Sequence, residues 1–218
     1  MEESIKATFW HIGEIIYRNK TKIIFNKDNE IEENLPCIGI ILMLNPGSCL
    51  PKEGKGSVLD LHERTKKELL CEPDLTMRKV EESISGAYDK YYDKLNGYVF
   101  IVNLCDKKEK SKNLIKKDFE ETDGKDKDAV KEIENKINEP QKQIEWIWVG
   151  FGKKSYGKDE EYIVDLKNRV LKQLNERFKD KIVGDNGDYN HTHPQRFQFD
   201  KNKQKIIIKE IESKLQNS

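Results

Sequence analysis

The stretch IGIILMLNPGS, residues 38–48, decides the fold class of this chain. Its first seven residues are nearly all aliphatic and do not alternate with polar ones, which is typical of a strand buried on both faces of a parallel sheet. The run ends on Asn45, followed by Pro46 and Gly47. Because α/β proteins bind ligands at the carboxyl ends of such strands, Asn45 is a candidate site residue. An Asn before Pro also favours a simple turn, which is the alternative.

Two later apolar runs have the same character. YVFIVNL, residues 98–104, carries Asn103 at its end, and IEWIWVGFGKKS, residues 144–155, turns at Gly150. A shorter run at 181–183 indicates a fourth strand, and residues 159–178 have the spacing of an amphipathic helix. This alternation predicts an α/β fold: a three-layer α/β/α sandwich with a central, mostly parallel four-stranded sheet. The length of 218 residues fits a single domain, residues 1–218.

The remaining segments are assigned from their local patterns. Residues 22–25 predict a short antiparallel or edge strand before the main sheet. Helical spacing predicts helices over 61–70, from 73 to about 95 and over 125–138, and a further element at 203–215. Trp146 and Trp148 lie two apart in the third strand, so we expect both on one face, in the core.

The overall charge predicts no class of partner. The chain has 40 basic and 40 acidic residues and a formal net charge of zero. Any nucleic-acid contact would therefore depend on local basic groups. Lys153 and Lys154 follow the third strand and further lysines follow the second, although both groups also fit ordinary solvated lysines.

The cysteines and the start of the chain indicate a compartment. The four cysteines contain no C-x-x-C pair, which argues against zinc ribbons and thioredoxin chemistry. Residues 1–6 are charged, and no apolar segment of a signal peptide follows them. No run approaches the ~20 apolar residues of a membrane-spanning helix. We therefore expect a cytoplasmic protein with reduced thiols and no membrane contact.

Four short motifs follow one another along the chain: Asn45-Pro46-Gly47, Asn103-Leu104, Trp148-Val149-Gly150 and His193-Pro194. In this order they resemble the motifs of the uracil-DNA glycosylase superfamily. In that superfamily a first strand ends in Asp or Asn followed by Pro, and a second ends in a Leu-Asn motif whose Asn contacts the base. A third strand ends in a Trp-Gly-type turn, and a late loop carries His-Pro. The Asn of the first motif resembles the mismatch-specific branch.

The resemblance implies hydrolysis of the N-glycosidic bond of a base that has been flipped out of DNA. Asn45 would position the attacking water, although an amide is a weaker activator than a carboxylate. His193 would donate a hydrogen bond to the base oxygen as the bond breaks. Asp74 would be a second carboxylate near the sugar, or else only the N-cap of a helix.

The resemblance also implies three base-binding residues. Asn103 would pair with one polar edge of the base, because an amide offers both a donor and an acceptor. The alternative is that Asn103 satisfies loop backbone groups. Gly47 stands where the typical uracil enzyme carries a Tyr that walls off the C5 position, so the pocket would accept a C5 substituent. Phe151 would either stack on the base or anchor its loop.

Contacts with DNA are expected after the His-Pro motif and at the lysines. Phe197 would be the wedge in the base stack, where the superfamily carries Leu, and Arg196 would bind a phosphate, together with Lys153 and Lys154. No metal is expected, because the two histidines of HTHP, residues 191–194, have no partner carboxylate. No cofactor is expected either, because the cysteine spacing does not match that of the iron–sulfur relatives.

Together these residues predict a monofunctional, monomeric DNA glycosylase that leaves an abasic site. Its substrate would be uracil or a C5-modified pyrimidine, for instance a hypermodified phage base, and its role DNA repair or antiviral defence. A non-catalytic nucleic-acid or nucleotide-binding module on the same fold is a second interpretation, and hydrolysis of free nucleosides or nucleotides is a third.

Overall fold

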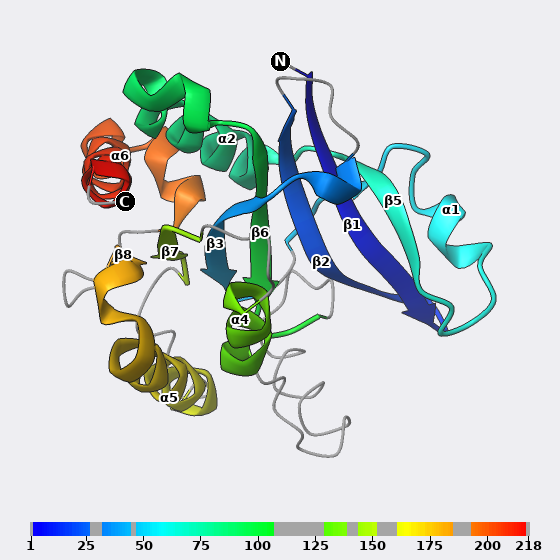
Figure 1. The fold of residues 1–218 in the computed structure, drawn as a ribbon. Coiled ribbons are helices and arrows are strands. Elements are labelled where there is room, and N and C mark those ends of the chain that lie inside the picture. The colour runs from blue at the N-terminus through cyan, green and yellow to red at the C-terminus, as the bar shows by residue number, and fades with distance from the viewer. Residues whose placement is uncertain are drawn as a thin grey trace.

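The computed structural model describes residues 2–26, 32–44, 47–106, 129–138, 144–151, 161–184 and 193–216. These residues form an eight-stranded mixed sheet with the strand order β4-β5-β1-β2-β6-β3-β7-β8 (Figure 1). The α/β class predicted from the sequence is confirmed. The prediction of a four-stranded, mostly parallel sheet is wrong, because an antiparallel half extends the sheet beyond its parallel strands.

The parallel half consists of the four strands that the sequence predicted. They are β6 (Gly97–Asn103), β3 (Cys37–Met43), β7 (Trp146–Val149) and β8 (Ile182–Val183). β3 pairs in parallel with β6 and with β7, and β7 pairs in parallel with β8. Every residue of these strands is buried, as their unbroken apolar runs predict.

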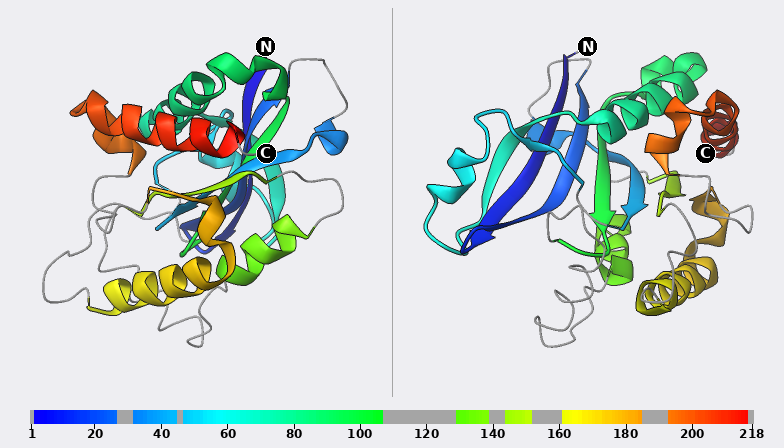
Figure 2. Two further views of the ribbon diagram at one scale, coloured as in Figure 1. Left: turned by 60° about the vertical axis from the view of Figure 1, so that its left-hand side comes forward. Right: turned by 180° about the vertical axis from the view of Figure 1, so that it is seen from behind.

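Helices cover both faces of the parallel half. α2 (Leu75–Ala87) and α6 (Lys201–Gln216) lie on one face, and α4 (Ala129–Ile137) and α5 (Glu161–Phe178) lie on the other (Figure 1, Figure 2). Each face has its own apolar core, with Ile41 and Val99 on the α2 side and Ile40 and Phe100 on the α5 side. This half therefore has the expected α/β/α layering.

Gly39 interrupts the aliphatic run of β3 because a Trp ring crosses it. A Cβ added at Gly39 would lie 2.2 Å from the ring of Trp146, its register partner on β7. Trp146 and Trp148 are both fully buried in the core on the α2 side, as expected. A glycine within a buried strand here marks the close approach of a neighbouring side chain.

The antiparallel half is built on a long hairpin of β1 (Glu2–Ile12) and β2 (Ile15–Asn26). β2 joins the halves by pairing with β6, β5 (Lys67–Glu72) pairs with β1, and β4 (Leu50–Pro51) pairs with β5. Residues 22–25 thus belong to a 12-residue internal strand rather than a short one. The prediction of a helix over 61–70 is wrong, because the strand β5 begins at Lys67. The apolar run there is too short to distinguish a helix from a strand.

A bulge changes the direction of side chains within β2. The register between β1 and β2 shifts by one residue near Lys20, whose φ is 49°. Such an extra residue reverses the alternation of faces. Arg18 pairs with the core residue Phe9 before the shift, and Thr21 pairs with the core residue Ile101 after it. Both polar side chains therefore lie on the face that α2 covers.

The other helix predictions are largely confirmed. α5 matches the helix predicted over 159–178, and α4 lies within 125–138. The element expected at 203–215, whose type was left open, is the helix α6. The helix predicted from 73 to about 95 is shorter, because α2 ends at Ala87 and the 3-10 segment η2 (Asp89–Lys94) follows. The remaining short segments are η1 (Glu32–Asn34), α1 (Gly56–Leu59), η4 (Lys179–Lys181) and η6 (Pro194–Gln198). None of the helices described has the length and apolar content needed to cross a bilayer.

Candidate functional site

The carboxyl ends of β3, β6 and β7 lie beside one another at one edge of the sheet. Met43 is the register partner of Asn103, and Leu42 is the register partner of Val149. The N–H of Gly150 continues this alignment by donating to the Leu42 carbonyl at 2.8 Å. The segments that follow these three strands therefore emerge at the same edge.

The His-Pro segment reaches this edge through η6. The Cδ atom of Pro194 lies 3.6 Å from the place where a Cβ would stand at Gly150. His193 is half-buried, and its Nδ1 accepts a hydrogen bond from the N–H of Gln195 at 3.2 Å. Because Nδ1 is an acceptor, the proton of the neutral ring lies on Nε2. His193 thus carries its N–H donor on Nε2, and it directly precedes Pro194, which lies near Gly150.

Asn103 ends β6 with a buried side chain. The residue is only 1% exposed, and neither its amide oxygen nor its amide nitrogen has a hydrogen-bond partner among the residues that the structure describes. Ile101 and Val99, which precede it on the same side of the strand, belong to the core under α2. A buried amide without partners costs free energy, which makes Asn103 the strongest candidate for contact with a ligand.

Asp74 is engaged in local structure through both of its oxygens. As the N-cap of α2, its Oδ1 accepts from the N–H of Met77 at 3.0 Å. Its Oδ2 accepts from the N–H of Ser48 at 3.2 Å, from the Ser48 hydroxyl at 3.1 Å and from the N–H of Cys49 at 3.1 Å. The N-cap interpretation is confirmed. The geometry gives no support to a second catalytic carboxylate here, because both oxygens are occupied.

Gly47 is required by the turn in which it lies. Its φ is 69°, a left-handed conformation in which a side chain is strained. The turn directs the N–H groups of the next two residues at Asp74. A Cβ at Gly47 would lie 3.4 Å from the Asp74 carboxylate, an ordinary contact. Room for a C5 substituent at this position stays a prediction, and Asn45 lies outside the described residues.

Two aromatic residues predicted to contact DNA or the base lie in the core. Phe197 is 1% exposed and stacks on Trp148 with the ring centroids 5.8 Å apart, so its assignment as the wedge is wrong. Phe151 is 1% exposed and belongs to the core on the α5 side, opposite the face of Asn103. Its carbonyl accepts a hydrogen bond from Lys167 Nζ at 3.4 Å. Loop anchoring fits Phe151, and stacking on the base does not.

The exposed aromatic ring after the His-Pro motif belongs to Phe199. It is 77% exposed and lies between η6 and α6. So large an exposed fraction leaves the ring without a packing role in the fold. Arg196 lies in η6, and its contact with a phosphate stays a prediction. Lys153 and Lys154 lie outside the described residues.

A group of buried polar residues on β2 was not predicted from the sequence: Arg18, Asn19 and Thr21. The guanidinium of Arg18 donates to the Cys49 carbonyl at 3.1 Å, and the Arg18 N–H donates to the Asp106 carbonyl at 2.7 Å. Asn19 Nδ2 donates to the Asp106 carboxylate at 2.9 Å. These contacts tie β2 to the loops after β3 and after β6. The signal in the sequence is the polar run RNKTK, residues 18–22, between the apolar runs IIY and IIF.

Two thiols fill the core beneath the loop after β3. Cys49 and Cys71 are each 1% exposed. The two largest causes that raise the pKa of Cys71 are a hydrogen bond with Cys49, which is the larger, and burial, which is the smaller. The Cys71 thiol therefore stays protonated. Cys71 therefore behaves as a small apolar side chain rather than as a reactive thiolate.

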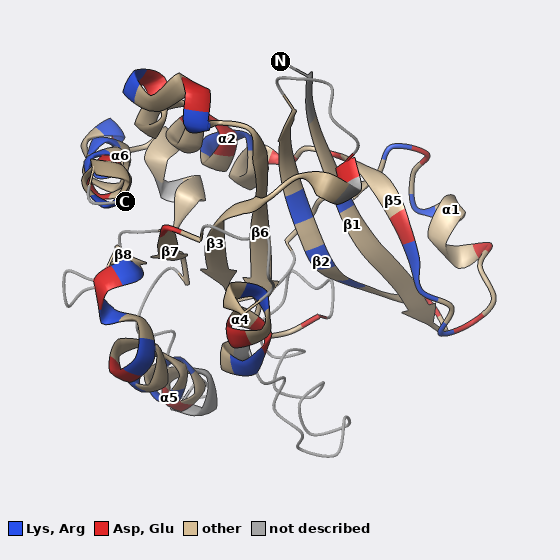
Figure 3. Cartoon of the chain, viewed as in Figure 1, with Lys and Arg blue, Asp and Glu red and all other residues tan. Residues whose placement is uncertain are grey.

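Charges of both signs are interspersed over the described helices and strands (Figure 3). Lys79 pairs with Glu82 at 2.5 Å, and Lys203 pairs with Asp200 at 3.4 Å. Within the described ranges, no three His, Cys, Asp or Glu side chains gather so as to hold a metal ion. This distribution gives DNA binding no special support, and a DNA partner stays a prediction.

The structure brings part of the predicted site together. Gly47 precedes the two N–H groups that donate to Asp74, Asn103 ends the strand beside β3, and His193 precedes Pro194, which lies near Gly150 at the end of β7. Phe197 and Phe151 have packing roles instead, because Phe197 stacks on Trp148 and Phe151 packs in the core on the α5 side. Comparison of the chain with protein-family models, with curated proteins and with solved structures finds no match in any of the three.

Proposed function

We propose that this chain is a DNA glycosylase with a uracil-DNA glycosylase-like fold. It would hydrolyse the N-glycosidic bond of a flipped-out uracil or C5-modified pyrimidine. The proposal rests on the buried amide of Asn103, which has no partner among the described residues. An amide presents a donor and an acceptor side by side, which matches the adjacent N–H and C=O groups of a pyrimidine. A ligand edge of this kind supplies both missing hydrogen bonds.

In the proposed reaction, water replaces the base at C1′ of the sugar. The C1′–N bond breaks, the water oxygen bonds to C1′, and negative charge develops on the departing base. The Nε2–H of His193 donates to the base oxygen where this charge develops, since its Nδ1 is occupied by the N–H of Gln195. The proton lost by the water balances the one gained by the base, and an abasic sugar remains.

In this proposal Asn45 orients the water. The Asp74 carboxylate does not, because it already accepts hydrogen bonds from the first turn of α2 and from the loop after β3. An amide oxygen orients a water but is a weak base. The rate therefore depends on how well the base leaves. This dependence, together with Gly47 in place of a bulky residue, favours modified pyrimidines as substrates.

The same occupancy of Asp74 favours one other function. A site without an available carboxylate suits a non-catalytic module that binds a nucleic acid or a nucleotide through Asn103. Both functions predict binding, but only the enzyme predicts release of a free base. The biological role that follows from the enzyme is DNA repair, or defence against phage whose DNA carries the modified base, by a cytoplasmic monomer.

Phe199 replaces Phe197 as the residue that we propose inserts into the base stack. We expect Phe199→Ala to slow base release from duplex DNA about tenfold or more, because stacking of a ring on a base contributes roughly 1–3 kcal/mol. Release from single-stranded DNA should change less, because no duplex must be opened. Rates on both forms of one oligonucleotide test this. Equal losses of rate on both forms would contradict insertion of Phe199 into the base stack. The variant Phe197→Ala should instead destabilise the fold, by about 3–5 kcal/mol.

The test of the proposed function uses the 218-residue chain and oligonucleotides with uracil, 5-hydroxymethyluracil or thymine at one position. Mass spectrometry detects the released base, and alkaline strand cleavage detects the abasic site. Release of a base supports the enzyme, and preference for 5-hydroxymethyluracil supports the C5-modified substrate. Cleavage of uracil DNA alone rejects that substrate and the defence role. No release from duplex, single-stranded or nucleoside substrates rejects the enzyme and favours the binding module.

A further inference from the structure

We propose that Thr21 on β2 is a second base-binding residue, which shares one polar edge of the bound base with Asn103. The inference rests on the proposed function, because the class of ligand is taken from it. Thr21 is fully buried, and its hydroxyl has no hydrogen-bond partner in the part of the chain that the structure describes. Such a hydroxyl destabilises the fold unless something else provides its bond.

The strand register sets Thr21 beside Asn103. Thr21 opposes Ile101 across the β2–β6 pair, and Asn103 follows Ile101 by two positions, so the two polar side chains are diagonal neighbours on one face. Diagonal neighbours in an antiparallel pair lie about 7 Å apart. The two side chains do not hydrogen-bond each other, and at this separation both can reach one small ligand.

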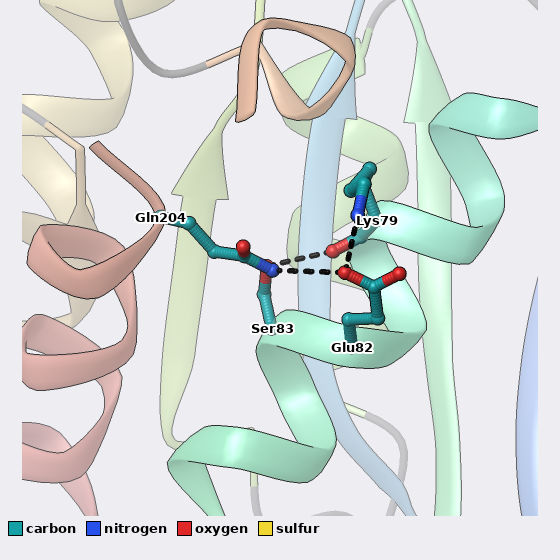
Figure 4. A network of polar contacts seen from close by, with 4 residues as sticks. All are labelled: Lys79, Glu82, Ser83 and Gln204. Carbon is teal, nitrogen blue, oxygen red and sulfur yellow. Dashed lines mark hydrogen bonds and ion pairs between the residues drawn. The ribbon is translucent and has the colours of Figure 1, made fainter. Parts of the chain in front are cut away.

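The fold provides partners for the buried hydroxyl of Ser83, on α2. Ser83, which is also fully buried, donates to the Lys79 carbonyl at 2.7 Å and accepts from Gln204 Nε2 at 3.2 Å (Figure 4). Thr21 and Asn103 differ from Ser83, because neither the hydroxyl of the one nor the amide of the other has a partner among the described residues. Unpartnered polar atoms thus gather where β2 meets the end of β6.

The chemistry of the two side chains fits a pyrimidine edge. Uracil presents O2, N3–H and O4 in one row, as acceptor, donor and acceptor. Asn103 can bond two adjacent groups, and the Thr21 hydroxyl, which rotates to donate or accept, can bond the third. Because both side chains are buried, a base reaches them only when the surrounding chain opens locally.

The test compares Thr21→Val and Thr21→Ser with Thr65→Val, a matched control at an exposed threonine. Free uracil and 5-hydroxymethyluracil are the probes for calorimetric binding, and a duplex with the same base measures release. We expect Thr21→Val to weaken binding and kcat/KM about tenfold, the worth of one hydrogen bond. Thr21→Ser should retain both, and Thr65→Val should match the wild type. Without a probe, Thr21→Val should melt at a higher temperature, because a methyl replaces an unpartnered hydroxyl.

Three results would overturn the inference. The wild type could bind neither probe, Thr21→Val could bind the probe and release the base as well as the wild type does, or Thr21→Val could melt at a lower temperature than the wild type. The last would show that the hydroxyl supports the fold. Thr21-dependent binding of a free base without any release from DNA would sustain the inference while rejecting the glycosylase. Base release that does not depend on Thr21 would reject the inference alone.

Discussion

At the edge where the parallel strands end, Asp74 accepts four hydrogen bonds, whereas Asn103 is buried without a partner among the described residues. A polar group with partners stabilises the fold, and a buried one without them costs about 1–3 kcal/mol. The difference separates a residue that holds the frame of the site from one that we propose contacts the ligand. Residue type and position in the sequence did not distinguish these two roles.

Asn103→Leu should have the largest effect of the changes that test this comparison. Leu keeps the branched shape but loses both the donor and the acceptor, so we expect base release to fall about 100-fold or more. Single-turnover rates on a modified duplex measure this. Ser83→Ala is the control at a buried polar residue with partners, and should leave the rate unchanged. If Asn103→Leu released base at the wild-type rate, the amide would have no part in the site.

Asp74→Ala should act mainly on stability. Loss of the N-cap and of the bonds to Ser48 and Cys49 should lower the free energy of unfolding by about 2 kcal/mol, measured by urea denaturation. Base release by the folded variant should fall far less than in Asn103→Leu.

Asp74→Asn gives the sharper version of this test. Its amide oxygen still accepts a cap hydrogen bond, so we expect an intermediate loss of stability. If this variant were as stable as the wild type but released base as slowly as Asn103→Leu, the carboxylate would be catalytic. The contrast between the two residues would then be lost.

Replacement of His11, which lies in the antiparallel half, should have the smallest effect on stability. Its Nε2 lies 2.9 Å from the Leu61 carbonyl, and its Nδ1 lies 2.8 Å from the Gly13 carbonyl. Only the imidazolium donates at both nitrogens, so these two carbonyls raise the pKa of His11, with Leu61 as the larger cause. This contribution to stability is complete below the unfolded pKa of about 6.5 and is lost as the pH rises through the folded pKa.

The free energies of unfolding of the wild type and of His11→Ala should therefore differ less as the pH rises from about 6 to about 8. Urea denaturation across this range measures the difference, and base release should be alike in the two proteins. A difference that stays constant with pH would show that His11 acts through packing rather than through its charge.

The parallel half could be predicted because burial on both faces leaves unbroken apolar runs in the sequence. The shared face of Trp146 and Trp148 followed from the two-residue period of a strand. The antiparallel half could not be predicted in the same way. The polar run RNKTK, residues 18–22, interrupts the apolar pattern in the middle of β2, and the short apolar run of β5 fits a helix as well as a strand.

The site could be predicted only in part, because several roles depend on tertiary contacts. The positions of Asn103 and His193 followed from strand ends and motif order. Phe197 and Phe199 are two apart, and the stacking of Trp148 on Phe197 decides which ring is buried. Thr21 faces the core only because of the bulge at Lys20, which the sequence does not reveal.

The free energy of unfolding of Asn103→Leu, relative to the wild type and without ligand, decides whether the amide serves a ligand or the fold. If the amide is retained for a ligand, its removal should raise stability by about 1–3 kcal/mol in urea denaturation, even as base release is lost. A stability lowered by a similar amount would mean that the amide supports the fold, and would contradict the account.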